Sequence, residues 1–357
     1  MNDIGIAASG HSMNKPSIEH KLVSLIFSTI PFSFLAQVTR TNLIVPYYHV
    51  VSDDRLPLVS HLHYHKNVSQ FSSDIDFLLK NLSPIGLPEV INSLRTGRTL
   101  PGKVFLLTFD DGFREMSDVV APILLKRGIP ATFFITSGFV DNKELFYKHN
   151  ASLLVEHLWS LQKQHRLSPA VEARIAKILP MSQAGSGDIN SAILSITYRQ
   201  KKLLEEIAQL IDLDCNDYLS RHKPYLTSDQ VRGLIRDGFS IGAHSIDHPL
   251  YSSLSVDEQL FQTLESVKLL KEKFLLDYGA FAFPHSDNGV SGEFFLRLSR
   301  SELVDISFGT GGMINDSFPT NFQRFSLERP MPARRIIALQ FARKIIKTAV
   351  GVNPTPR

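Results

Sequence analysis

The sequence predicts an α/β fold that is built on a parallel β-sheet and interrupted by a helical insertion. Two observations predict the sheet: short, β-rich apolar runs alternate with amphipathic helical patterns, and the runs are apolar almost throughout. Strands that helices cover on both faces have this composition, and parallel strands need such crossover connections. The chain has 357 residues, 43% of them hydrophobic, which is enough apolar material for one large domain or two ordinary ones.

Six segments have the character of buried strands, because each is a short apolar run bounded by turn residues. They are residues 43–49, 104–109, 131–136, 239–243, 279–283 and 304–308. Helical patterns lie between most of them, and the clearest are residues 71–81, 118–127 and 256–274. Gly128 ends the second of these helices, because glycine accepts the left-handed conformation that often closes a helix. Acidic Asp257 near the start of the third helix and basic Lys273 near its end suit the helix dipole.

The segment from about residue 142 to residue 223 breaks the alternation of strands and helices. It is rich in Leu, Ala, Gln, Lys and Glu, so we expect a helical insertion between two halves of the sheet. The predicted organisation is an N-terminal apolar segment (1–40), a main domain (41–335) that contains the insertion (142–223), and a basic C-terminal tail (336–357).

Both ends of the chain have features that bear on membrane contact. Residues 22–39 carry no charge, but Pro31 and several Ser and Thr residues argue against a stable spanning helix. No acidic residue follows Glu328, and the tail combines basic and apolar positions. Two interpretations stay open: both ends pack on the domain as surface helices, or both rest on an anionic membrane surface. Without a clear export signal we expect a cytoplasmic protein, peripheral at the inner membrane face under the second interpretation.

Charge and cysteine content argue against some classes of protein. The formal net charge of +3 is too small to indicate a polyanionic partner, and no nucleic-acid-binding motif is present. Cys215 is the only cysteine, so no intrachain disulfide can form.

Two neighbouring aspartates, Asp110 and Asp111, follow the predicted strand 104–109 in the stretch VFLLTFDDGF. Adjacent residues of a regular strand face opposite ways, so both carboxylates can reach one site only if the strand ends and the chain turns. Gly112 permits that turn. In α/β folds, functional sites assemble at the carboxyl ends of strands. The alternative is that DDG is an ordinary turn that caps the following helix.

A pair of histidines, His244 and His248, follows another predicted strand in GAHSIDHPL. Their spacing of four residues puts both imidazoles on one face of a helical turn, as in many metal sites. His61 and His65 have the same spacing, but they lie in a polar connection with no strand before them. We therefore expect His61, His63 and His65 at the rim, and the pair at the strand end near the aspartates.

One carboxylate and two imidazoles predict a site for a divalent metal, with the second carboxylate beside it. Three protein ligands leave a coordination position open for water, which is typical of catalytic zinc. The metal lowers the pKa of that water and the spare aspartate accepts its proton, so the chemistry indicated is metal-assisted hydrolysis. Two histidines and a carboxylate also suit non-haem iron, so zinc is the first expectation and other divalent ions stay open.

The motifs TFDDG, GIPATFFITSGF and H-S-x-x-H-P, in this order, resemble the polysaccharide deacetylase family, the NodB homology domains of carbohydrate esterase family four. The resemblance extends from about Pro46 to Phe308, apart from the insertion. It implies a distorted, TIM-like (β/α) barrel of mostly parallel strands and metal-dependent removal of N-acetyl groups from amino sugars.

By position, the resemblance implies that Asp110 is the general base and Asp111 a metal ligand. It likewise implies that His244 and His248 are the two imidazole ligands.

The third and last family motifs differ in this chain. The third reads FAFPHSDNG, no arginine stands just upstream of it, and no histidine follows His285. The leaving amine still needs a general acid. One candidate is His49 in VPYYHVV, which resembles a branch of the family with an early Tyr-His pair. The other is His285 itself.

We therefore predict a deacetylase that acts on an N-acetylated polysaccharide, oligosaccharide or glycolipid headgroup. Water on the metal attacks the acetyl carbonyl with Asp110 as base, and His49 or His285 protonates the amine. Two alternatives stay open: a sugar-binding or membrane-surface protein of the same fold with a degraded site, and a metal-dependent O-acyl esterase.

Overall fold

The computed structural model of the chain describes residues 18–179 and 188–349. The first 17 residues of the predicted N-terminal segment and the last eight of the predicted tail (350–357) lie outside the described residues. The described chain forms two compact units, and the smaller one consists of Arg55–Tyr64 and Leu145–Arg221. All other described residues belong to the larger unit.

An eight-stranded parallel sheet forms the centre of the larger unit. Its strands are β2 (Pro46–Tyr48), β5 (Leu107–Phe109), β6 (Ala131–Ile135), β7 (Ser240–Ala243), β8 (Ala280–Ala282), β9 (Ile306–Gly309), β10 (Asn321–Gln323) and β11 (Phe325–Ser326). Their order across the sheet is β10-β9-β8-β7-β6-β5-β2-β11, and every pair is parallel.

The two outermost strands of this sheet are consecutive in the chain. β10 pairs with β9 and β11 pairs with β2, and only Arg324 lies between β10 and β11. A sheet whose opposite edges are one residue apart must curl until it almost closes. The α/β, TIM-like barrel predicted from the sequence is therefore confirmed, although the sequence did not indicate the two strands that meet at its seam.

A three-stranded parallel sheet continues the barrel at one end. It consists of β1 (Leu43–Ile44), β4 (Val104–Phe105) and β3 (Ser83–Pro84), with β4 in the centre. The predicted strands 43–49 and 104–109 thus each divide into two short strands, one for each sheet.

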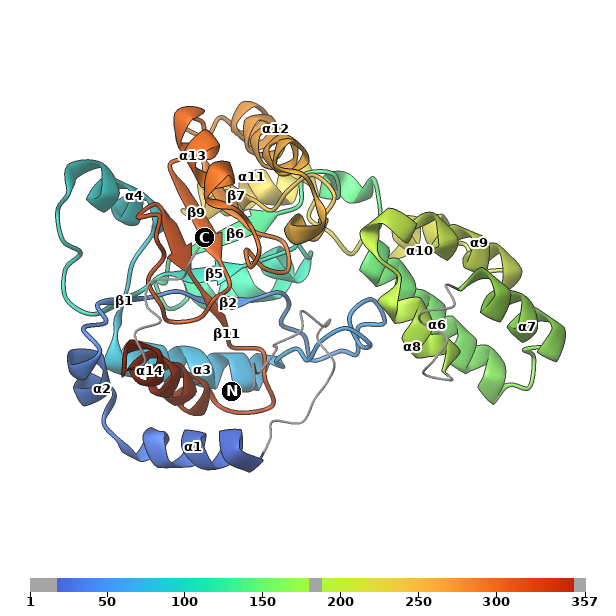
Figure 1. Cartoon of the computed structure of the whole chain (residues 1–357), viewed down its shortest axis with the longest axis horizontal. Helices are drawn as coiled ribbons and strands as arrows, with labels where there is room; N and C mark the ends of the chain where they lie inside the picture. Colours follow the sequence, from blue (N-terminus) through green and yellow to red (C-terminus); the bar gives the residue numbers. More distant parts are fainter. Residues whose placement is uncertain (1–17, 180–187, 350–357) are drawn as a thin grey trace, which may run out of the picture. The chain divides into compact units, whose positions relative to one another are not determined.

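Helices cover the barrel on its outside. Those of the larger unit are α1 (Ile18–Thr29), α2 (Phe32–Val38), α3 (Val68–Asn81), α4 (Leu87–Thr96), α5 (Ala121–Leu125), α11 (Ser228–Arg236), α12 (Val256–Phe274), α13 (Gly292–Arg300) and α14 (Ala333–Ala349). Figure 1 shows α11, α12 and α13 on one side of the sheet and α3, α14 and α1 on the other, with α1 outermost. α12 has the predicted bounds because Ser255 and Glu258 form a capping box at its start.

In the smaller unit, the described residues between Leu145 and Arg221 are mainly helical, whereas Arg55–Tyr64 forms turns. Its helices are α6 (Tyr147–Lys163), α7 (Pro169–Ile178), α8 (Ile189–Ser195) and α9 (Lys202–Leu210), and α10 (Cys215–His222) lies at its end. Arg55 binds the carboxylate of Glu156 on α6 with both guanidinium nitrogens, at 2.6 and 2.7 Å. This ion pair attaches the 55–64 segment to the helices.

The uncharged segment 22–39 forms two helices rather than one. α1 ends at Thr29 and α2 begins at Phe32, with Pro31 between them. α1 packs along α14, so the apolar segment and the basic tail lie side by side. Within residues 18–179 and 188–349, no helix has both the length and the apolar character that crossing a bilayer requires.

A buried ion pair fastens the start of α14 to the barrel. Lys66 and Asp74 lie 3.0 Å apart, and each side chain is 3% exposed. Asp74 also accepts hydrogen bonds from the Tyr48 hydroxyl and from the backbone N–H of Ala333, the first residue of α14. Lys66 donates in addition to the carbonyl oxygen of Met331. The pair therefore joins α3, β2 and α14.

We expect Asp74→Ala to lower the free energy of unfolding by about 3–5 kcal/mol, because it leaves the Lys66 ammonium buried without its counter-charge. Chemical denaturation followed by circular dichroism measures the change. Asp76→Ala on the same helix is the matched control, since Asp76 is 65% exposed and pairs with Arg127 at the surface. We expect the control to change stability by less than about 0.5 kcal/mol. Equal effects of the two substitutions would contradict this account of the pair.

Candidate metal centre

The two aspartates lie at the carboxyl end of β5, where the chain turns sharply. Asp111 and Gly112 both have positive φ, at 77° and 79°. A Cβ atom at Gly112 would lie 3.2 Å from the Ile135 side chain, so the close approach to β6 also favours glycine here. The sequence predicted that a turn lets both carboxylates reach one site, and in the structure Asp110 and Asp111 follow this turn and are buried.

The helical turn expected around His244 and His248 does not form. β7 ends at Ala243, and the residues after it make an irregular bend. Ser245 and His248 have positive φ, at 67° and 62°, which no α-helix accommodates. The bend nevertheless brings the two imidazoles together, with 3.1 Å between their Nε2 atoms. The expectation of a helix was wrong, because spacing alone cannot show that two residues have left-handed backbones.

Three side-chain atoms of Asp111, His244 and His248 face one another in the interior. Oδ1 of Asp111 lies 3.1 Å from Nε2 of His248 and 3.5 Å from Nε2 of His244. Oδ1 is buried and accepts no hydrogen bond of good geometry from the described residues. Ligands about 2.0–2.1 Å from a tetrahedral ion are about 3.3 Å apart, which is close to these three separations. The donor set therefore fits a single divalent ion.

The imidazole of His244 has its free nitrogen directed to this centre. Its Nδ1 lies 2.8 Å from the carbonyl oxygen of Ala282, which can only accept a hydrogen bond, so Nδ1 carries the proton. Nε2 of the neutral ring then has a lone pair for a metal. Burial lowers the pKa of His248, which favours the neutral ring that a metal requires. The Ser245 hydroxyl accepts a hydrogen bond from the backbone N–H of His248 and so supports the bend.

Asp110 is paired with an arginine that the sequence analysis did not identify. Arg324 donates two hydrogen bonds to the Asp110 carboxylate, at 2.7 and 2.8 Å, and its side chain is fully buried. Burial raises the pKa of Asp110, but the Arg324 guanidinium outweighs it and the net pKa is lowered. Asp110 is therefore a carboxylate that can accept a proton.

His49 is positioned beside the aspartates by strand pairing. Tyr48 and Phe109 are register partners in β2 and β5, so His49 and Asp110 leave adjacent strand ends. Nδ1 of His49 lies 2.5 Å from the carboxylate of Glu328, which also accepts the backbone N–H groups of His49 and Val50. Burial lowers the pKa of His49, but Glu328 more than compensates and raises it to about 9. His49 is therefore protonated at neutral pH, and its side chain is 24% exposed.

His285 also lies at this end of the barrel. Its ring meets the ring of His248 edge-on, with the centroids 4.6 Å apart. His285 is exposed and has a positive φ of 57°. Both candidates for the general acid are thus close to the proposed ligands, and the carboxylate of Glu328 holds the ring of His49 protonated.

Two histidines of the other cluster, His61 and His65, contact residues outside the proposed metal centre. His61 binds Glu156 within the smaller unit, at 2.9 Å, and its ring meets Trp159 edge-on. His65 contacts the carbonyl oxygen of Asp54. Hydrogen bonds of this kind are those of structural histidines.

Arg324 and Glu328 are the residues that the sequence analysis missed. Each lies more than two hundred residues from its partner, Asp110 or His49. One signal was available: FQRFSLE (322–328) places an arginine and a glutamate in an otherwise strand-like run. A charged residue in a run that reads as a buried strand indicates a partner in the interior.

A comparison with families of known proteins gives one match. Residues 97–184 match the family described as polysaccharide deacetylase. The match begins before TFDDG and extends into the predicted insertion. It confirms the family resemblance that the motifs predicted and, with it, the enzyme class, a hydrolase. No curated protein matches the chain.

Three solved structures have a similar fold. The deacetylase PplD of Streptococcus pyogenes, determined in complex with acetate, is 15% identical, with 84% of this chain and 97% of that one covered and a TM-score of 0.52. IcaB from Ammonifex degensii is 17% identical, with coverage of 84% and 97% and a TM-score of 0.51. A de-N-acetylase from Aggregatibacter actinomycetemcomitans is 16% identical, with coverage of 83% and 99% and a TM-score of 0.53. At these identities the likeness shows a shared fold.

We expect His248→Ala to weaken zinc binding at least about a hundredfold, because it removes one of three ligand atoms. Isothermal titration of the metal-free protein with zinc measures the affinity, and mass spectrometry of the purified protein measures its metal content. His65→Ala is the control, since it removes a histidine that lies outside the proposed metal centre and contacts the carbonyl oxygen of Asp54. Unchanged zinc affinity of His248→Ala would refute the assignment of this ligand.

Proposed function

We propose that this chain removes N-acetyl groups from an amino-sugar glycan in a metal-dependent reaction, and the match of residues 97–184 to the polysaccharide deacetylase family supports this proposal. One observation carries the proposal. Asp111, His244 and His248 present three ligand atoms to one point, and Asp110 is held ionised next to Asp111. A metal site with a separate carboxylate beside it is an arrangement that suits hydrolysis of an unactivated amide.

The metal proposed is a single divalent ion, with zinc first. A divalent ion held by these ligands would polarise the acetyl carbonyl and lower the pKa of a water molecule. Two imidazoles and one carboxylate match the ligands of catalytic zinc, and they also suit non-haem iron.

Two residues of the chain move the protons. Asp110 accepts the proton of the attacking water as the new C–O bond forms. Arg324 keeps Asp110 ionised and fixes both of its oxygens, so the base has one orientation. His49 is protonated at neutral pH and donates its proton to the nitrogen as the C–N bond breaks. The products are acetate and a free amine.

The substrate class follows from the family and not from a bound ligand. A glycan with N-acetylated amino sugars, as a polysaccharide, an oligosaccharide or the headgroup of a glycolipid, presents the amide that this chemistry attacks. Acetate bound to the Streptococcus pyogenes deacetylase, which has a similar fold, supports acetate as a product. The cytoplasmic location stays a prediction.

We expect the zinc-loaded protein to release acetate from at least one member of a panel of N-acetylated oligosaccharides. Asp110→Asn should retain zinc and lower kcat by about 10²–10⁴-fold, because the base is lost while the ligands remain. An enzyme-coupled acetate assay, with metal content measured on the same samples, gives both quantities.

Three outcomes would contradict this function in different ways. Full zinc occupancy with no acetate from any glycan would favour a sugar-binding protein of the same fold. Release of acetate from O-acetyl esters alone would favour an esterase. Near-normal turnover by Asp110→Asn would show that Asp110 is not the general base, although it would not contradict the assignment of the metal ligands.

We expect kcat/KM to fall as the pH rises past about 9, because His49 then loses the proton that it must donate. In Glu328→Gln the fall should begin at lower pH, since burial lowers the pKa of His49 and the opposing carboxylate is gone. A pH–rate profile of the two proteins measures the shift. Superimposable profiles would exclude His49 as the general acid and leave His285 as the candidate, to be tested by His285→Ala.

A further inference from the structure

The outer helices α1, α2 and α14 form a layer that is poor in acidic residues. We call these three helices the outer helical layer. Neither residues 20–52 nor residues 329–357 contain Asp or Glu, and Glu19 is the one acidic residue within the three helices. Basic residues are frequent there: Arg40 follows α2, and α14 alone contains five. The layer is therefore cationic, although the net charge of the chain is only +3.

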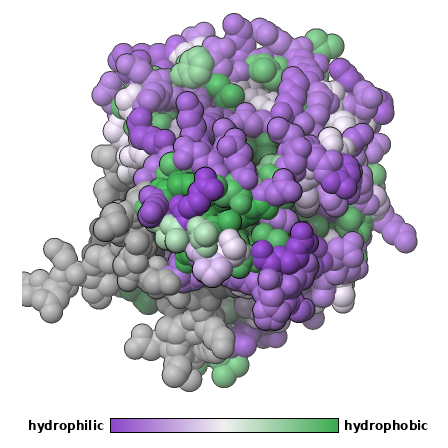
Figure 2. All heavy atoms as spheres, turned by 90° about the vertical axis from the view of Figure 1, so that its right-hand side faces the viewer, coloured by the Kyte–Doolittle hydropathy of each residue, from purple (hydrophilic) through white to green (hydrophobic). Residues whose placement is uncertain are grey.

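Large apolar side chains are exposed on the same layer. Leu25 and Ile26 of α1 are each 55% exposed, and Phe34 and Val38 of α2 are each 56% exposed. Ile346 of α14 is 59% exposed. Figure 2 shows a face on which hydrophilic residues dominate, with the largest group of hydrophobic residues near the middle. Several exposed aliphatic and aromatic residues in one short segment mark an interaction surface.

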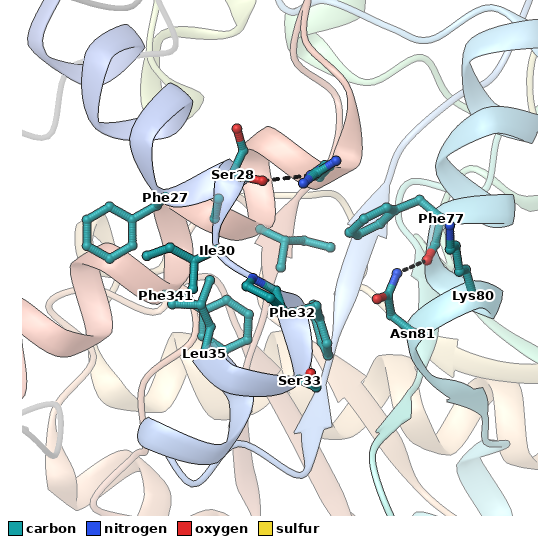
Figure 3. A pocket seen from close by; sticks show the side chains of 14 residues that line it. Phe27, Ser28, Ile30, Phe32, Ser33, Leu35, Phe77, Lys80, Asn81 and Phe341 are labelled. Atoms are coloured by element: carbon teal, nitrogen blue, oxygen red, sulfur yellow. Dashed lines mark hydrogen bonds between the residues drawn. The ribbon is translucent and has the colours of Figure 1, made fainter.

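A groove of about 260 Å³ opens between these helices and α3. Nine of its fourteen lining residues are apolar and five are polar or charged, and Figure 3 shows Phe27, Phe32 and Phe341 around it, with Phe77 on the opposite wall. Two cations lie among the lining residues: Lys80, and Arg334, whose Nε donates to the carbonyl oxygen of Ser28. The groove thus combines an apolar interior with basic groups.

We propose that the outer helical layer binds the surface of an anionic lipid bilayer. Exposed apolar residues enter the boundary between headgroups and acyl chains, and neighbouring basic residues contact anionic headgroups, as in other interfacial amphipathic helices. The helices lie on the bilayer and do not cross it, in agreement with the absence of a spanning helix among the described residues.

The charge of the layer favours a bilayer over a second copy of this chain. A symmetric dimer through this face would bring two cationic surfaces together, and like charges across an interface oppose association. An anionic bilayer supplies both the negative charge and the apolar phase that the layer needs. The proposal does not depend on the deacetylase activity, because lipid binding is measured without a glycan.

Sedimentation of the full-length, zinc-loaded protein with lipid vesicles tests the proposal. We expect binding to vesicles of phosphatidylcholine with phosphatidylglycerol, and at least about tenfold weaker binding to phosphatidylcholine alone. Raised salt should weaken the binding, because it screens the attraction between basic residues and headgroups.

Two substitutions separate the apolar and the cationic contributions. Phe34→Glu should weaken binding to anionic vesicles at least about tenfold, since it replaces an apolar ring by a carboxylate, which has the same charge sign as the lipid headgroups. Arg343→Gln should weaken it about fivefold, through loss of one cation near the surface. Phe261→Glu is the matched control, because Phe261 is 61% exposed on α12 and we expect no change. Thermal unfolding of each variant verifies that it is folded.

Three results would overturn the proposal. The first is no binding to anionic vesicles. The second is equal binding by wild type and Phe34→Glu, which would place the contact elsewhere, including residues 1–17. The third is a dimer in lipid-free solution that Phe34→Glu converts to a monomer, which would assign the layer to contact between two copies.

Discussion

A fully buried ion pair between Arg324 and Asp110 joins the seam of the barrel to the proposed reaction site. Arg324 is the single residue between the two outermost strands, and its side chain reaches the carboxylate at the end of β5. Rings of Tyr47, Phe134 and Phe308 surround the guanidinium, with centroids 4.9 to 5.9 Å from its carbon. Burying two charges costs roughly several kcal/mol per ion before their attraction is counted. A buried ion pair therefore adds little net stability to the fold, and stability alone does not explain this one.

The buried Arg324–Asp110 pair has a functional explanation if Asp110 is the general base. The bidentate contact fixes the direction of both carboxylate oxygens, and the permanent charge of Arg324 keeps the carboxyl ionised despite its burial. Glu328 has the opposite effect on His49, because its carboxylate raises the pKa of the imidazole and keeps it protonated. Arg324 and Glu328 lie four residues apart at the end where the barrel closes, so one segment sets the protonation of both groups.

Four residues at the same place have strained backbones. Asp111, Ser245, His248 and His285 all have positive φ. Such conformations cost on the order of 1 kcal/mol each for residues other than glycine, and they persist where the surrounding structure enforces them. Two of the four are proposed ligands, one supports a ligand through its hydroxyl, and one meets a ligand ring edge-on. The strain directs side chains that a regular helix or strand would send apart.

Local patterns in the sequence were sufficient for most of the longer elements and for the four residues of the proposed metal centre. The helix 256–274 was predicted to the residue, because its capping box and its terminal charges are local signals. The strand ends carrying Asp110, Asp111 and His244 were predicted because apolar runs and turn residues are local as well. β10 and β11 were missed, since strands of two or three residues have no periodicity to detect. The partners Arg324 and Glu328 were missed because only closure of the barrel brings them to Asp110 and His49. The bend after β7 was predicted as a helical turn because a spacing of four residues does not reveal the sign of φ.

The most direct test of this account is an anomalous difference map from crystals grown with zinc. The account predicts a single strong peak, about 2 Å from Oδ1 of Asp111 and from Nε2 of His244 and His248, with Asp110 still paired with Arg324 and not bound to the ion. A peak at another place, no peak, or a peak ligated by Asp110 instead of Asp111 would contradict it.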